Sequence, residues 1–231
     1  MSDAVFGFNT IIPLKKSEIL LDRLKQDNSP PFDLDYICQV PFSLKKDITL
    51  KYIIETERLL LREITLKDSG DLFILHSDPK VQRYTGEPVV ASLDEMERAI
   101  RARINNYSKY GYGRWATFLK KDMQFIGWAG LAYLPEFDEI DIGYRFLTEY
   151  WGNGLATEAS FAILEYGFRK LKLKRIIALA MKDNLASIRV MQKIGMKFYK
   201  LAPYEEGSEN VVWYCIENDR TPITTERTFL T

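Results

Sequence analysis

The chain has 231 residues, of which 46% are hydrophobic, enough for one sizeable core and a small accessory region. Its 32 basic and 32 acidic residues leave no net charge, so the composition predicts neither a nucleic-acid nor a membrane-surface partner. No apolar run approaches the roughly 20 residues of a membrane span, and residues 1–10 lack the pattern of a secretory signal. We therefore expect a cytoplasmic protein.

Residues that commonly bind metals or form disulfides are scarce. The two cysteines, Cys38 and Cys215, are far apart in sequence, and His76 is the single histidine. This usage argues against a disulfide framework and against a zinc or other metal site. His76 stands near the end of a predicted helix, and we expect it to have a structural role.

The chain divides into three zones. Residues 1–52 are irregular and are interpreted as an accessory N-terminal segment of unknown role, in which the pattern allows a short helix at residues 17–25. Residues 53–217 show regular patterns of strands and helices and are predicted to form one domain. Residues 218–231 have the composition of a polar tail.

Within the regular zone, alternation of apolar residues predicts strands, and apolar residues at helical spacing predict helices. The first half is predicted to contain a strand at 58–64, helices at 68–76 and 93–107, and strands at 114–119, 124–133 and 138–146. The second half is predicted to contain a helix at 155–171, a strand at 175–180, a helix at 185–194, and strands at 196–201 and 211–217. The three successive strands imply an antiparallel meander, and the next helix implies a parallel crossover. The order is mixed α and β.

Two glycines stand where the strand at 138–146 gives way to a long helix. Gly152 and Gly154 can adopt positive φ angles, and the N–H groups at the start of a helix are unpaired and attract anions. This pattern suits a pyrophosphate, although it is also typical of a simple tight turn. A Walker loop is absent from the sequence, and a dinucleotide fingerprint would need glycine where Thr157 stands.

Five motifs in one order resemble the GCN5-related N-acetyltransferase (GNAT) family, within it the branch of the ribosomal-protein N-terminal acetyltransferases RimJ and RimL. The motifs are Thr56-Glu57-Arg58-Leu59-Leu60-Leu61-Arg62, Asp141-Ile142-Gly143-Tyr144, Tyr150-Trp151-Gly152-Asn153-Gly154-Leu155-Ala156-Thr157-Glu158-Ala159, Asn184-Leu185-Ala186-Ser187 and Gly195-Met196-Lys197-Phe198. The resemblance covers residues from about 55 to 217. Trp151 stands where the wider family has Gln or Arg, a departure typical of the RimJ/RimL-like branch.

The resemblance implies a mixed α/β fold with a mostly antiparallel sheet of about six to seven strands, a splayed parallel pair and about four flanking helices. It also implies acetyl-CoA as the co-substrate. The residues expected to contact CoA are Ile142, Gly143 and Tyr144 beside pantetheine, Trp151, Gly152, Asn153, Gly154, Leu155 and Ala156 around the pyrophosphate, and Asn184 on the CoA arm.

The late helix is expected to supply a proton donor. Many relatives carry a tyrosine general acid where Met191 stands, and the resemblance assigns that role to Ser187 instead, as in RimL-like enzymes. The residues alone also allow a plain interpretation, in which Asn184 caps the helix and Ser187 bonds to the backbone of its first turn.

Carboxylates on the central strand are candidates for the general base. Glu139 and Asp141 are two residues apart, so they share one face of the strand. If this face lines the acceptor cleft, one of them accepts the proton of the amine; if it faces solvent, both are ordinary surface charges. Glu87, in a loop that borders the acceptor site in relatives, is a second candidate.

The resulting hypothesis is an N-acetyltransferase that transfers acetyl from acetyl-CoA to a primary amine by direct attack. The acceptor is a protein or peptide N-terminus, a polyamine or another small amine, and the enzyme is a monomer or homodimer. The alternative is a non-catalytic acyl-CoA-binding module whose N-terminal segment engages a partner. No motif identifies the acceptor.

Overall fold

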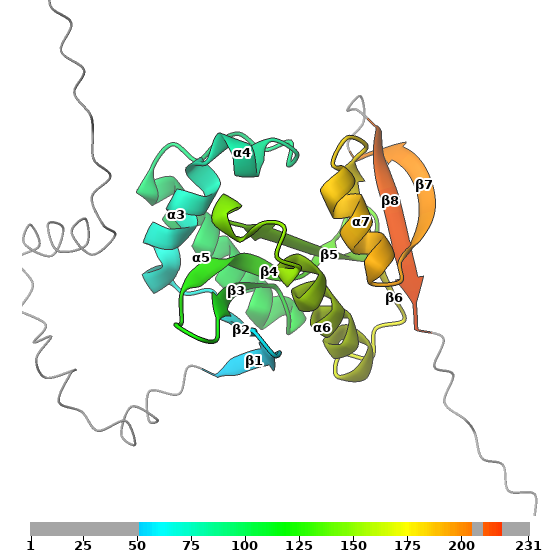
Figure 1. Ribbon diagram of the computed structural model, residues 1–231, viewed down its shortest axis with the longest axis horizontal. Helices are drawn as coiled ribbons and strands as arrows, with labels where there is room; N and C mark the ends of the chain where they lie inside the picture. The colour runs from blue at the N-terminus through cyan, green and yellow to red at the C-terminus, as the bar shows by residue number, and fades with distance from the viewer. Residues whose placement is uncertain (1–50, 205–209, 219–231) are drawn as a thin grey trace, which may run out of the picture. The chain divides into compact units, whose positions relative to one another are not determined.

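The computed structural model describes residues 51–204 and 210–218, in which eight strands form one sheet and five α-helices accompany it (Figure 1). The strands are β1 (Tyr52–Glu55), β2 (Leu59–Glu63), β3 (Arg114–Leu119), β4 (Phe125–Leu134), β5 (Glu139–Phe146), β6 (Arg175–Met181), β7 (Lys197–Pro203) and β8 (Asn210–Glu217). The helices are α3 (Ser69–Ser77), α4 (Pro79–Gln82), α5 (Leu93–Tyr110), α6 (Leu155–Arg169) and α7 (Leu185–Lys193), with 3-10 turns η2 (Leu66–Asp68) and η3 (Thr148–Tyr150).

The order of strands across the sheet is β1-β2-β3-β4-β5-β6-β8-β7. Every neighbouring pair is antiparallel except β5 and β6, which are parallel and are connected through α6. The predicted fold class, a mixed and mostly antiparallel sheet with one parallel pair, is confirmed. The meander and the crossover also occur where the sequence predicted them.

Two short elements account for the difference from the predicted numbers of strands and helices. β1 has four residues and α4 has four residues, and neither shows a periodic pattern long enough to detect. Pro79 at the first position of α4 and the side chain of Asp78, which accepts from the N–H of Lys80, define that helix by its start signals alone. The longer predicted elements agree with the structure to within a few residues at their ends.

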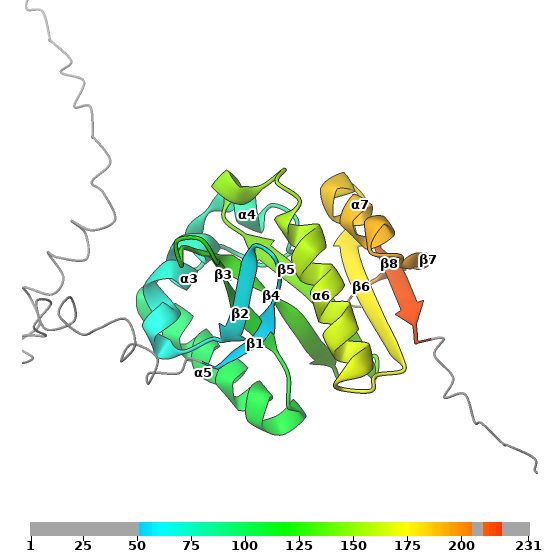
Figure 2. The same cartoon turned by 60° about the horizontal axis from the view of Figure 1, so that its bottom comes forward.

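The core consists of two apolar clusters, one on each face of the sheet. Successive residues of β4 divide between them: Ile126 belongs to the cluster that includes Ile163 of α6, and Phe125 belongs to the cluster that includes Leu72 of α3 and Ile100 of α5. Because side chains alternate along a strand, the two clusters lie on opposite faces. Figure 2 shows α6 lying along the sheet on the side away from α3 and α5.

The start of α5 is close to a capping box. The hydroxyl of Ser92 accepts from the N–H of Glu95 at 3.2 Å, as expected for an N-cap. The carboxylate of Glu95 accepts a hydrogen bond from the N–H of Ala91 at 3.0 Å, one residue earlier than a capping box requires. Both bonds satisfy main-chain donors at the start of the helix.

The accessory segment predicted for residues 1–52, with its short helix, lies outside the described residues apart from its last two. The predicted polar tail also lies outside them apart from Asn218. Both divisions stay predictions. In the described part of the chain, no helix combines the length and apolar character needed to cross a membrane.

Candidate active site

A turn with two left-handed glycines connects β5 and η3 to α6. Gly152 and Gly154 have φ angles of 77° and 76°, which glycine adopts without a steric penalty. The first helical bond at this end runs from the N–H of Glu158 to the carbonyl of Gly154, so the earlier N–H groups have no partner within the helix. A Cβ placed on Gly152 would meet no heavy atom within 4 Å. Open space and unpaired donors at a helix start suit an anion.

The carboxylate of Glu158 ties this turn to the start of β2. One of its oxygens accepts from the hydroxyl of Thr56 at 2.6 Å and from the N–H of Arg58 at 2.9 Å; the other accepts from Nε of Arg58 at 2.6 Å. Arg58 also donates to the carbonyl of Asn153, at 3.0 Å. Burial would raise the pKa of Glu158, but the bonds from Thr56 and Arg58 outweigh burial and hold this pKa below its ordinary value. The two segments, far apart in sequence, are therefore fixed to one another.

Trp151 fixes the other side of the turn. Its indole N–H donates to the carbonyl of Phe146, the last residue of β5, at 2.7 Å, and the side chain is 51% exposed. The side-chain amide of Asn153 donates to the carbonyl of Trp151 at 3.2 Å. These side chains stabilise the turn. The main-chain N–H of Trp151 donates to the carbonyl of Thr148, whereas those from Gly152 to Ala156 stay available to a ligand.

The parallel strands β5 and β6 touch at their first halves and then diverge. Their strand pairing consists of one position, Asp141 opposite Ile177, whereas β5 pairs with β4 along its whole length. Within the described residues, Ile142 to Phe146 therefore have no strand partner on the β6 side. This unpaired edge offers main-chain donors and acceptors to an extended ligand. Ile142, Gly143 and Tyr144, predicted to lie beside pantetheine, stand at its start.

Ser187 lies across this opening from β5, at the start of α7. Asn184 is the N-cap of α7, as the sequence predicted: its side-chain oxygen accepts from the N–H of Ser187 at 3.1 Å. The hydroxyl of Ser187 does not bond to its own helix; it shares a hydrogen bond of 3.1 Å with the phenol of Tyr144. Met191, which stands in place of the family tyrosine, is buried in the core.

Glu139 and Asp141 share one face of β5, as predicted, and each has an arginine partner. Glu139 pairs with Arg175 at 3.1 Å, and Asp141 pairs with Arg114. Asp141 is buried, so it is not a surface charge. Burial raises the pKa of Asp141, and Arg114 and the N–H of Leu179 act in the opposite direction without cancelling this shift.

Glu87, the second carboxylate suggested by the sequence, reaches the same face from the loop after α4. Its carboxylate is 3.0 Å from Nη1 of Arg145, and its side chain is largely exposed. A Cβ on the neighbouring Gly86 would lie 3.8 Å from the side chain of Met181 at the end of β6. The loop therefore spans from β5 toward β6 and borders the strand opening.

Comparison of the sequence with known protein families identifies the family of this chain. The domain described as "Acetyltransferase (GNAT) domain" matches residues 58–197. The chain belongs to the GNAT acetyltransferase family. Membership makes it an acetyl-CoA-dependent acetyltransferase.

Several relatives of this GNAT protein are known by sequence or structure. "Uncharacterized protein YkkB" of Bacillus subtilis is 35% identical over 172 residues, covering 67% of this chain and 95% of that protein. A GNAT acetyltransferase structure from Bacillus anthracis is 28% identical with a TM-score of 0.61 and covers 71% of this chain and 97% of that one. RimL, the ribosomal L7/L12 α-N-protein acetyltransferase in complex with coenzyme A, shares the fold at 21% identity with a TM-score of 0.64, over 74% of this chain and all of RimL (100%).

The structure brings together more of this GNAT site than the sequence indicated. The phenol of Tyr144 and the arginines that hold the carboxylates, Arg114 and Arg145, were not singled out, because single polar residues on strands carry no local signal of their partners. Glu158 stands in the glycine-turn motif, and its spacing from Gly154 was the one available hint. In the described part of the chain, no group of three or more His, Cys, Asp or Glu residues is arranged to hold a metal ion.

His76 has the structural position expected of it, buried in the last turn of α3. Its two ring nitrogens face donors: Nε1 of Trp128 at 3.1 Å and Nη1 of Arg145 at 2.9 Å. A protonated ring has no nitrogen free to accept from either. Burial, then the charges of Arg145 and Arg103, lower the pKa of His76 from 6.5 to about 3.

This lowered pKa predicts an acid-sensitive fold. Between the folded pKa of about 3 and the ordinary value of 6.5 the unfolded chain binds a proton that the folded chain excludes, so stability falls as the pH drops below about 6.5. At pH 5 His76 should cost about 2 kcal/mol relative to pH 7.5. Urea unfolding at both pH values should show that His76→Gln, which cannot titrate, loses less stability than the wild type. Equal losses would contradict the prediction.

Proposed function

We propose that this GNAT protein transfers the acetyl group of acetyl-CoA to a primary amine, that of a protein or peptide N-terminus or of a small molecule, by direct attack. The observation that carries the proposal is the succession of an unpaired strand edge, from Ile142 to Phe146, and the glycine turn that follows it. A ligand with an extended amide arm and a pyrophosphate would meet both in sequence. The fold shared with RimL makes a protein N-terminus one acceptor class to test.

The donor would be held mainly by main-chain groups. The N–H groups from Gly152 to Ala156 would receive the pyrophosphate, while the N–H of Trp151 already donates to the carbonyl of Thr148. The edge beginning at Ile142, Gly143 and Tyr144 would pair with pantetheine. Asn184, already the cap of α7, would contact the CoA arm. A main-chain N–H of the strand edge would bond to the thioester oxygen, where negative charge develops during attack.

The chemistry requires little more than placement and two proton transfers. The amine nitrogen forms a bond to the thioester carbon, the carbon–sulfur bond then breaks, and the sulfur leaves with the bonding electron pair. Ser187 would return a proton to this sulfur, and the phenol of Tyr144, hydrogen-bonded to Ser187, would hold its hydroxyl in place. Burial raises the pKa of Tyr144, so its phenol stays protonated at neutral pH.

The proton of the attacking amine needs an acceptor on the opposite face of β5. Asp141 lies where β5 and β6 begin to separate, and its raised pKa makes it a stronger base than an ordinary carboxylate. Glu139 lies two residues earlier on the same face, next to Arg175. We assign the role of general base to these two carboxylates, which would accept the amine proton directly or through one water molecule.

A thiol-release assay tests this function. The full chain with acetyl-CoA should release CoA thiol at a rate that depends on an added amine, and mass spectrometry should detect the acetylated amine. The acceptors to compare are peptides of varied N-terminal residue, amino acids and polyamines. A non-catalytic CoA-binding module predicts CoA binding in calorimetry with no amine-dependent release from any acceptor, and that result would overturn the proposal.

A further inference from the structure

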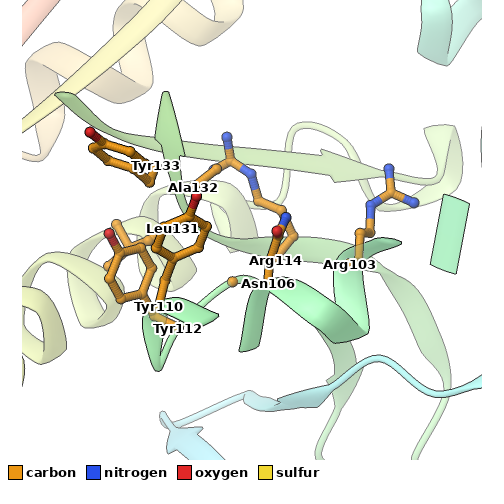
Figure 3. Close-up of a pocket in the computed structure, with 9 residues that line it drawn as sticks. Arg103, Asn106, Tyr110, Tyr112, Arg114, Leu131, Ala132 and Tyr133 are labelled. Atoms are coloured by element: carbon orange, nitrogen blue, oxygen red, sulfur yellow. The ribbon is translucent and has the colours of Figure 1, made fainter. Parts of the chain in front are cut away.

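Three arginines from three different elements converge on the face of β5 opposite Tyr144. They are Arg103 of α5, Arg114 of β3 and Arg145 of β5. The guanidinium groups of Arg114 and Arg145 lie 5.3 and 5.2 Å from the ring centre of one tryptophan, Trp128. Arg103 and Arg114 line one pocket, and Figure 3 shows both side chains extending to the same side of it.

Two of these arginines have carboxylate partners. Arg114 pairs with Asp141 and also donates to the carbonyl of Gly130 at 2.6 Å. Arg145 pairs with Glu87 at 3.0 Å. The group thus contains three positive charges and two negative ones, since His76 beside Arg145 is uncharged at neutral pH.

Arg103 differs from the other two because one of its buried donor atoms, Nη1, has no hydrogen-bond acceptor among the residues that the structure describes. A buried donor without an acceptor is costly, and a guanidinium is suited to bind a carboxylate through two parallel bonds. Burial and the charge of Arg145 lower the pKa of Arg103, Glu87 raises it, and Arg114 lowers it again, which agrees with an excess of positive charge.

These charges lie beside the place where acetyl transfer is proposed. A Cβ on Gly143 would come within 3.0 to 3.1 Å of the Arg114 guanidinium, so this group lies flat on β5 just where the strand separates from β6. The loop carrying Glu87 closes the same side toward Met181. An acceptor bound on this face of β5 would therefore lie near the positive charges of these arginines.

We propose that the acceptor carries a carboxylate near its amine and that Arg103 binds this carboxylate. The inference rests on the proposed amine acetylation and specifies its substrate class: an amino acid, through its α-carboxylate, or a peptide N-terminus with an acidic side chain. A polyamine, which is all cationic, is repelled by the same three charges.

The test compares acceptors that differ only in this charge. Leucine is paired with leucinamide for the α-carboxylate, Ser-Asp-amide is paired with Ser-Asn-amide for the side chain, and spermidine is the cationic acceptor. The wild type should favour the carboxylate in one of the pairs by about tenfold or more in kcat/KM and should use spermidine poorly. Arg103→Gln should remove this preference by raising the KM of the carboxylate-bearing acceptor, and Arg103→Lys should keep part of it. The control is Arg101→Gln, since Arg101 is exposed on the same helix, and this variant should leave the preference unchanged.

A binding measurement separates this inference from the proposed function. In the presence of CoA, calorimetry should detect binding of N-acetylleucine or N-acetyl-Ser-Asp-amide, which resemble the products, to the wild type. Arg103→Gln should bind them more weakly. The corresponding uncharged amides should not bind detectably. If carboxylate binding is present without turnover, the proposed function fails and the carboxylate site stands. If amines are acetylated with no carboxylate preference, or with a preference that persists in Arg103→Gln, the proposed site is wrong.

Discussion

Replacing Gly154 by valine should weaken CoA binding by about 10- to 100-fold, since forcing a residue into a sparsely populated backbone region costs about 1–3 kcal/mol. The φ angle of Gly154 is 76°, which a β-branched residue resists strongly. The turn would relax away from this conformation, and CoA would have to restore it on binding. The added side chain would also project toward Arg58, whose Nη2 lies 3.7 Å from the position of a Cβ.

Isothermal calorimetry with CoA measures this effect. Gly154→Ala should lie between the wild type and the valine variant, because alanine lacks the β-branch. Gly70→Val is the matched control, since Gly70 lies in α3, where a Cβ would meet no atom within 4 Å. Thermal unfolding shows whether each variant folds. If a folded Gly154→Val protein binds CoA as tightly as the wild type, the glycine turn is not the pyrophosphate site.

Removing the hydroxyl of Ser187 should lower kcat by about 100-fold, the lower end of what general acid catalysis contributes. Tyr144→Phe should lower kcat less, by about tenfold, because water can replace the phenol as the partner of Ser187. The two hydroxyls share one hydrogen bond of 3.1 Å, so their effects should not add. The double variant should be no slower than Ser187→Ala alone.

Changing the leaving group shows whether these losses of kcat come from lost proton donation. An aryl thioester expels a more acidic thiol that needs no proton, so Ser187→Ala and Tyr144→Phe should react with it nearly as fast as the wild type. Tyr214→Phe is the control, since its hydroxyl bonds to Gln192 at 3.3 Å instead of to Ser187. If both variants are equally impaired with acetyl-CoA and the aryl thioester, the hydroxyls have a purely structural role.

Much of the fold was predictable because its signals are local. Apolar periodicity located the three strands of the meander and helix α6, and the two glycines marked the turn between β5 and α6 before any contact was known. The N-cap of α7 was predictable from Asn184 for the same reason, since a cap acts within a few residues. β1 and α4 were missed because four residues are too few to show a period.

The partners of the site residues were not predictable, since they depend on how distant segments pack. The hydroxyls of Tyr144 and Ser187 belong to residues 43 apart, and the bond from Thr56 to Glu158 joins residues 102 apart. The sequence placed Asp141 on one face of β5 but did not show whether that face was solvent-exposed or buried. Only the packing of α3 to α5 against the sheet answers this.

The glycine turn and the order of strands and helices were determined by the sequence itself, because they follow from local backbone preferences and from alternation along single elements. Together with the motifs that resemble the GNAT family, they were enough to predict the acetyl-CoA donor. The electrostatic character of the proposed acceptor side was decided by tertiary structure alone: three arginines meet two carboxylates there, and Nη1 of Arg103 has no acceptor among the described residues. Charge balance is set by which groups become neighbours in a low-dielectric interior, and a chain with no net charge can still build a locally positive site.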